Sequence, residues 1–179
     1  MKHFIDAMDS AVKNENWHGA IFIALSLPDI CGKIDRPNEG GSKIRYSTWF
    51  DDYVSERFRD KHGTGNLSGR DCYALRCALL HEGSDQTDTQ QASEVLEKIE
   101  FNCLTPVLTY HNVISQCGKK LQLNVKDFCR DIKFGVKKWL RVVSSEAEIQ
   151  RKLSSLLNVR NLNYENPYGT AEERPDWSI

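Results

Sequence analysis

The chain has 179 residues, of which 40% are hydrophobic and 27% charged, and its formal net charge is −1. This composition excludes an intrinsically disordered chain. The longest apolar stretches, Ala20–Leu25 and Cys77–Leu80, are far shorter than the roughly 18 residues that a membrane-spanning helix needs. His3, Asp6 and Asp9 lie where the apolar core of a signal peptide would begin. We therefore expect a cytoplasmic protein without a secretion signal and without a membrane partner.

Six cysteines lie at positions 31, 72, 77, 103, 117 and 129, and no two of them have the C-x2-C spacing of a structural zinc site. Several fall within apolar stretches, where a thiol behaves as a small hydrophobic group. We therefore expect reduced cysteines, no metal site and no cofactor.

The amino-terminal region has the periodicity of helices. Apolar side chains at helical spacing predict a short amphipathic helix over 3–13. Asn16 is expected to cap a nearly all-apolar helix over 17–27, which we take as the central core helix because a helix that is apolar on all sides must be buried. Pro28 disfavours α geometry in the residue before it, so we expect it either to kink this helix or to open a further turn through residues 29–31.

Two further helices are expected before residue 83, over 43–59 and 68–82. Ser42 and Ser68 are the expected caps at their amino termini, and Gly83 is expected to end the second of them.

The chain then becomes polar and, from residue 97, changes character. Segments 97–103, 108–115 and 121–125 are rich in β-branched and aromatic residues, which predicts two or three short antiparallel strands with a turn at Gly118. A helix over 125–143, a last helix capped by Ser145 and an extended tail over 161–179 follow. The expected fold class is mostly α: a single bundle of about six helices with a small antiparallel β insertion between roughly 97 and 124.

One pair of residues, Arg76 and His81, has the chemistry of RNA cleavage. On an ideal α-helix five steps place their side chains about 140° apart, so they converge only if the last turn relaxes. Arg76 can hold a phosphate with its planar fork of donors, and His81 can move a proton to or from a ribose oxygen near neutral pH. The helix carboxyl terminus favours the imidazolium form of His81, which suits an acid or an electrostatic stabiliser.

Both residues also have an ordinary structural interpretation. A cation in the last turn stabilises a helix end, and an arginine beside Leu75 and Leu79 can extend from an apolar face into solvent.

The R-x4-H motif formed by Arg76 and His81, late in a helix of a mostly helical domain, resembles the HEPN superfamily. The resemblance implies a bundle of four to five helices in residues 1–160, with the 97–124 insertion outside the common core. It also implies a composite active site in a homodimer and, in many members, metal-independent endoribonuclease activity in toxin–antitoxin or anti-phage systems. Other members are inactive binding or partner modules. RNA, a second copy of the chain, and an antitoxin or nucleotidyltransferase are the partners that it implies.

Four residues are candidates for support of the Arg76–His81 pair. Active HEPN members usually place Asn, Asp or His directly after the motif arginine, and Cys77 occupies that position here. Asp71 and Tyr73 can supply an orienting polar group. Asp29 can approach the pair if its helix packs against the motif helix; the alternative, which capping preferences favour, is that Asp29 caps a new turn after the proline.

Charge is distributed unevenly along the chain. Residues 119–152 carry a net charge of +6 and residues 82–100 a net charge of −5. Four cations of the basic stretch are candidate RNA contacts: Lys133, Lys137, Lys138 and Arg141. The alternative is a solvated helix face.

Three functions remain open. The first is a HEPN-like ribonuclease, and the second is an inactive HEPN-like binding or regulatory module, motivated by Cys77. The third is an assembly protein that uses the strand region as its interface.

Overall fold

The computed structural model describes residues 1–58, 67–84, 98–103, 113–114, 120–157 and 159. The first half contains α1 (Lys2–Lys13), α2 (Trp17–Asp35), α3 (Ser42–Tyr53), the 3₁₀ turn η1 (Ser55–Phe58), α4 (Gly69–Cys77) and the π-helical turn η2 (Ala78–Glu82). The second half contains β1 (Lys98–Asn102), β2 (Val113–Ile114), β3 (Lys120–Asn124), α5 (Val125–Val142) and α6 (Ala147–Ser154).

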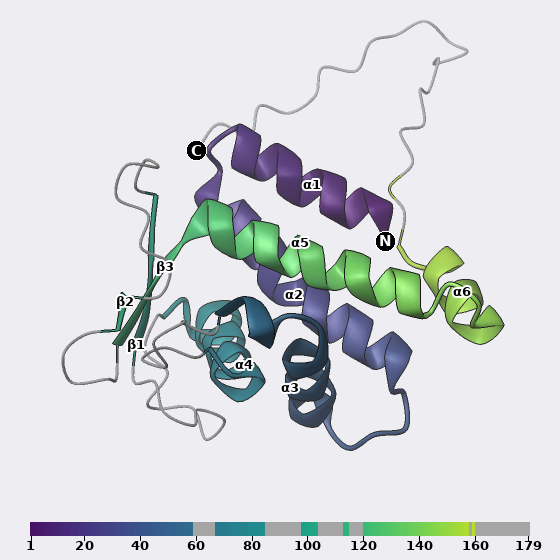
Figure 1. The fold of residues 1–179 in the computed structure, drawn as a ribbon. Helices are drawn as coiled ribbons and strands as arrows, with labels where there is room; N and C mark the ends of the chain where they lie inside the picture. Colours follow the sequence, from purple (N-terminus) through teal and green to yellow (C-terminus); the bar gives the residue numbers. More distant parts are fainter. Residues whose placement is uncertain (59–66, 85–97, 104–112, 115–119, 158, 160–179) are drawn as a thin grey trace, which may run out of the picture.

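The mostly helical fold class expected from the sequence is confirmed, with a small sheet at one end of the helices (Figure 1). The expected turn at Gly118 and the expected tail over 161–179 lie outside the described residues. Within the described ranges, no helix combines the length and apolar character needed to cross a bilayer.

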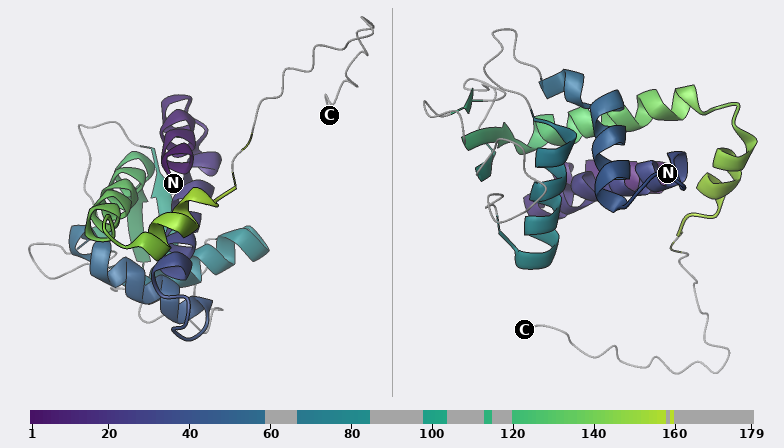
Figure 2. Two further views of the ribbon diagram at one scale, coloured as in Figure 1. Left: turned by 90° about the vertical axis from the view of Figure 1, so that its right-hand side faces the viewer. Right: turned by 90° about the horizontal axis from the view of Figure 1, so that it is seen from below.

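Helix α2 lies at the centre of the molecule and contacts α1, α3, α4, α5 and α6 (Figures 1 and 2). Most of its residues are apolar, and buried residues occur along most of its length. The backbone of α3 crosses α2 closely at Gly32, where an added Cβ would lie 2.6 Å from the Arg45 carbonyl oxygen. The expectation of a central core helix is therefore confirmed.

The expected end of the core helix at Leu27, with a new turn after the proline, is wrong, because α2 continues through Pro28 to Asp35. Proline fits helical φ but has no N–H to donate to the preceding turn, which costs about 3 kcal/mol in a helix interior. Burial of Leu27, Cys31 and Ile34 in the turns around Pro28 offsets this cost. Consequently Asp29 is an interior helical residue and not the cap of a new turn.

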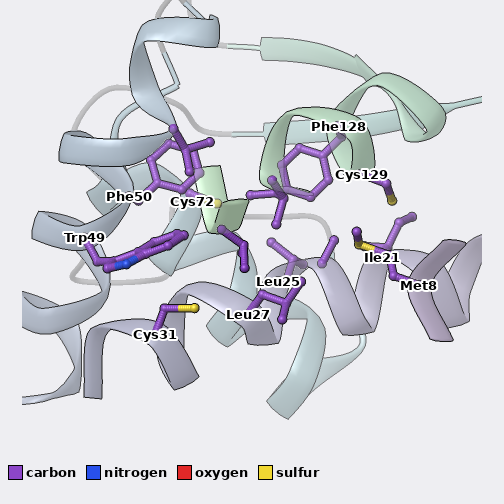
Figure 3. Packing of buried hydrophobic residues seen from close by; sticks show 14 of the residues in the cluster. Met8, Ile21, Leu25, Leu27, Cys31, Trp49, Phe50, Cys72, Phe128 and Cys129 are labelled. Carbon is purple, nitrogen blue, oxygen red and sulfur yellow. The ribbon is translucent and has the colours of Figure 1, made fainter. Parts of the chain in front are cut away.

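Aromatic side chains from α3 and α5, among them Trp49, Phe50 and Phe128, pack in the core beside α2 (Figure 3). The rings of Trp49 and Trp139 meet edge to face with centroids 6.2 Å apart. The indole N–H of Trp139 donates to Asp35 Oδ1 at 2.8 Å, so the buried indole keeps a hydrogen-bond partner. Phe50 stacks on Phe58, with the ring centroids 5.8 Å apart.

The expected strand insertion is confirmed as a sheet, but its topology is mixed. The order is β1-β3-β2, with β2 antiparallel to β3 as expected and β1 parallel to β3. The antiparallel expectation is therefore wrong for β1 and β3. A parallel pair needs a crossover of a dozen or more residues, and residues 103–119 supply that length. Ile99, Leu121 and Leu123 are buried against the helices.

Several helix ends agree with the sequence and others move slightly. Asn16 caps α2 by accepting from the Gly19 N–H at 3.0 Å, and Ser68 caps α4 by accepting from the Asp71 N–H at 3.0 Å. Ser42 is instead the first residue inside α3, because Gly41 is the cap. Glu146, not Ser145, precedes the last helix.

The buried thiols generate a prediction about alkaline stability. Burial raises the pKa of Cys72 and of Cys129 to about 12, from an ordinary value of 9.0. Both thiols stay protonated in the folded chain while the unfolded chain loses these protons. The stability they provide is complete below pH 9 and is lost as the pH rises from 9 toward 12, by about 1.4 kcal/mol per pH unit for each thiol.

We expect Cys72→Ala/Cys129→Ala to lose less stability than the wild type over the alkaline range. Urea unfolding followed by circular dichroism from about pH 8 to about pH 10.5 measures the slope. Cys103→Ala, which removes an exposed thiol, is the control for loss of a cysteine. Equal slopes for the double variant and the wild type would contradict the assignment.

Candidate active site

A π-helical turn brings Arg76 and His81 together. The helix α4 widens into η2, whose hydrogen bonds join residues five apart. In such a turn residues i and i+5 lie one above the other, as i and i+4 do in an α-helix. The turn is closed by Gly83, which adopts φ +65°, and by the Ser84 N–H, which donates to the Ala78 carbonyl at 3.1 Å.

The side chains of Arg76 and His81 are in direct contact. Arg76 Nη1 lies 3.2 Å from His81 Nε2. A guanidinium group only donates, so a hydrogen bond here requires His81 Nε2 to accept. The imidazole is then neutral with its proton on Nδ1, and this differs from the imidazolium form that the helix terminus alone would favour. A hydrogen bond from Arg76 therefore goes to a neutral imidazole, the form that can take up a proton.

Asp29 completes the arrangement from the centre of α2. Its Oδ2 lies 2.6 Å from Arg76 Nη2, and both side chains are about three-quarters buried, with 24% and 21% exposed. Of the two interpretations of Asp29, the approach to the pair is therefore correct. Burial by itself lowers the pKa of Arg76, but the Asp29 carboxylate, with Cys77 and Tyr73, raises it above its usual value. Arg76 therefore remains a cation over the whole pH range in which proteins are folded.

Tyr73 forms one wall beside the guanidinium. The Arg76 Cζ lies 6.0 Å from the centroid of the Tyr73 ring, and the Tyr73 hydroxyl is 3.0 Å from Ser42 Oγ at the start of α3. The Cys77 thiol is close enough to both Tyr73 and Arg76 to help raise the pKa of each. Three candidates from the sequence, Asp29, Tyr73 and Cys77, are thus brought to the pair.

Asp71 does not belong to this group. Its Oδ2 accepts a hydrogen bond from the Ser68 hydroxyl at 2.7 Å, and the Asp71 N–H donates to the oxygen of that hydroxyl. This reciprocal contact stabilises the first turn of α4, at the end opposite His81. These contacts give Asp71 a role in starting the motif helix.

The four predicted RNA contacts all lie on α5, but they face different neighbours. Lys133 Nζ pairs with Asp9 of α1 at 2.6 Å, and Lys137 is exposed beside it. Lys138 turns toward α3, where its Nζ donates to the Asp52 carbonyl at 3.2 Å and lies 5.9 Å from the Tyr53 ring centroid. Arg141 is exposed in the last turn. The helix period, which separates neighbouring residues by about 100°, prevents Lys137 and Lys138 from sharing a face.

Two features of the site had no clear signal in the sequence. Ser42 was identified only as a cap, although its hydroxyl contacts Tyr73. The π-turn has no composition of its own, because the run Ala78-Leu79-Leu80 is equally suited to an α-helix.

No group of three or more His, Cys, Asp or Glu side chains is positioned to share a metal ion within the described part of the chain. Cys72, for example, is buried against the Tyr46 hydroxyl, with Sγ and Oη 3.3 Å apart. Comparison of the sequence with family models and curated proteins, and of the fold with solved structures, finds no match.

The Asp29–Arg76 contact generates a prediction about stability. Asp29→Asn keeps the size of the side chain but removes the charge that balances the partly buried guanidinium, so we expect a loss of about 1 to 2 kcal/mol. Asp6→Asn is the matched control, because Asp6 pairs with Lys2 in solvent and an exposed pair of this kind contributes at most about 0.5 kcal/mol.

Urea unfolding at neutral pH measures both effects. A double-mutant cycle with Arg76→Gln should return most of the Asp29→Asn cost as coupling energy. Equal destabilisation by the Asp29 and Asp6 substitutions would show that the pair is no stronger than a surface contact.

Proposed function

We propose that this chain is a HEPN-like, metal-independent endoribonuclease that cleaves RNA with Arg76 and His81 at the cleft of a homodimer. Toxin–antitoxin or anti-phage function is the setting that the resemblance implies. The observation that carries the proposal is the Arg76 guanidinium held between the Asp29 carboxylate and the His81 imidazole, at 2.6 and 3.2 Å.

The two side chains have complementary tasks in RNA cleavage. Neutral His81 takes the proton from a ribose 2′-OH through Nε2, and the 2′-oxygen attacks the adjacent phosphorus while the bond to the 5′-oxygen breaks. Arg76 donates to the non-bridging oxygens, where negative charge accumulates in the transition state. The products are a 2′,3′-cyclic phosphate and a 5′-hydroxyl, and no oxidant or second substrate is consumed.

Asp29 is a positioning residue in this scheme. It fixes one edge of the guanidinium at Nη2, so that Nη1 points toward His81. When a phosphate binds, Nη1 can transfer its hydrogen bond from His81 to a phosphate oxygen, which frees Nε2 to accept the proton. The carboxylate then keeps the arginine in place during the exchange.

A homodimer supplies the group that one chain lacks. The leaving 5′-oxygen must be protonated while the 2′-oxygen is deprotonated, and a single Arg–His pair contains only one imidazole to move these two protons. A two-fold axis near the exposed His81 would place the equivalent histidine of the second copy on the other side of the phosphate.

A second candidate function is an inactive HEPN-like module that binds RNA or a protein partner. The specific observation in its favour is that Asp29 and His81 already occupy both terminal nitrogens of Arg76. The residue after the motif arginine, Cys77, also offers weaker hydrogen bonding than the polar residue usual in active members.

Cleavage of an unstructured RNA in the presence of EDTA tests the proposal. We expect the wild type to leave 2′,3′-cyclic phosphate ends, and His81→Ala to reduce the rate about 100- to 10,000-fold, because proton transfer is removed. Mass spectrometry of the fragments identifies the ends. His3→Ala is the control for loss of an imidazole, since His3 lies on α1, which contributes no residue to the Arg76 site.

The outcomes separate the two candidates. Equal cleavage by wild type and His81→Ala would remove His81 from the mechanism. A wild type that binds RNA and leaves it intact would favour the inactive module.

A further inference from the structure

A groove with a volume of about 350 Å³ lies between α1 and α5, two helices that run side by side (Figure 1). It is built from different elements than the Arg76 site, which uses α2, α3, α4 and η2. The groove has an apolar floor, which includes Val12 and Cys129, and a charged rim.

The rim is a continuous basic stripe on α5. Lys126, Arg130, Lys133 and Lys137 all line the groove, and their spacing of four, three and four residues places them on one face of a helix. Asp9 of α1 is the acidic residue of the lining, so the lining keeps a net positive charge. The sequence identified only Lys133 and Lys137 of this stripe.

The cations differ in how strongly they are held. Lys133 pairs with Asp9 and Arg130 with Asp127, so these two are already oriented by the protein. Lys137 is exposed and forms no hydrogen bond or ion pair with the part of the chain that the structure describes. At least one cation on the rim therefore lacks a counter-charge from that part of the chain.

An aromatic ring lies at or near each end of the stripe. Phe134 lines the groove with 47% of its surface exposed, and the Arg57 guanidinium lies 5.0 Å from its ring centroid. Lys126 Nζ lies 5.4 Å from the ring centroid of Trp17, which is only partly buried at the start of α2. Exposed aromatic rings beside a row of cations are the combination that holds single-stranded nucleic acid, because bases stack on the rings while cations follow the phosphates.

We infer that the α1–α5 groove is a binding track for single-stranded RNA, separate from the Arg76–His81 centre. The inference rests on RNA being the substrate of the proposed function, and it assigns to α5 the task of holding a length of strand outside the reacting nucleotides. An anionic membrane is a poorer fit, because Lys133 is recessed in a concave surface and 30% exposed. An acidic peptide would use the cations but not the exposed ring of Phe134.

The test measures the affinity and salt dependence of oligouridylate binding by fluorescence anisotropy, in a His81→Ala background so that cleavage does not interfere. Lys126→Ala/Lys137→Ala should weaken binding and reduce the slope of log K against log salt by about 1.4, because two phosphate contacts are lost. Lys138→Ala is the matched control: it removes the same charge from the next position on α5, where the side chain faces α3, and should leave the slope unchanged.

A second variant pair tests the stacking component independently. Phe134→Ala should weaken binding about tenfold without changing the salt slope, because stacking releases no counterions. Phe134→Leu keeps an apolar side chain but no ring and should weaken binding to a similar extent. Circular dichroism and thermal unfolding of each variant identify any loss of folding.

Each alternative outcome is decisive. Unchanged RNA affinity in the Lys126/Lys137 variant, or an equal effect of Lys138→Ala, would overturn the track. The track would also be overturned if the variants kept their RNA affinity but lost binding to phosphatidylserine vesicles or to a polyglutamate peptide. Because binding is measured without cleavage, a chain that binds RNA through the groove but does not cut it refutes the nuclease alone. A chain that cuts RNA while the groove variants bind normally refutes the track alone.

Discussion

Burial of α2 is the constraint on which the rest of the structure depends. A helix that is apolar on nearly every side must bury most of its surface, and α1, α3, α4, α5 and α6 all pack against it, leaving Phe22 39% exposed. The glycine at position 32 determines how closely the backbone of α3 can approach α2. Because α2 also carries Asp29, the packing that hides its apolar residues places a carboxylate beside the motif helix. The packing of α2 against its neighbours therefore forms both the core and the candidate site.

The site is stabilised by a balance between burial and charge. A partly buried guanidinium is costly unless its donors are occupied, and Asp29 and His81 occupy its two terminal nitrogens. These contacts hold the two terminal nitrogens, whereas the Arg76 Nε is buried and has no hydrogen-bond partner within the described residues. In the proposed mechanism a bound phosphate takes the place of His81 at Nη1. In the proposed cleavage, the same contact stabilises the resting state and is then exchanged for a phosphate contact.

Local patterns in the sequence predict most of the helices but few of their tertiary consequences. The caps at Asn16 and Ser68 and the stop at Gly83 depend on nearby residues, and each is found where expected. The helix α2 continues through Pro28, because burial of the residues around the proline outweighs its local preference to end a helix. The parallel pairing of β1 with β3 depends on where the chain returns after a long connection, which alternation of side chains does not encode.

The charge of the chain has a different meaning in three dimensions than in the sequence. The net charge of −1 conceals a basic stretch, and the helix period then divides that stretch: Lys133 and Lys137 face α1, whereas Lys138 faces α3. Acids inside the same helix partner part of the positive charge, since Asp131 binds Arg57 and Asp127 binds Arg130. The positive field that reaches solvent is therefore narrower than the count of lysines suggests. A narrow field along one groove can align a flexible polyanion, whereas the same charges spread over all faces of α5 would only attract it.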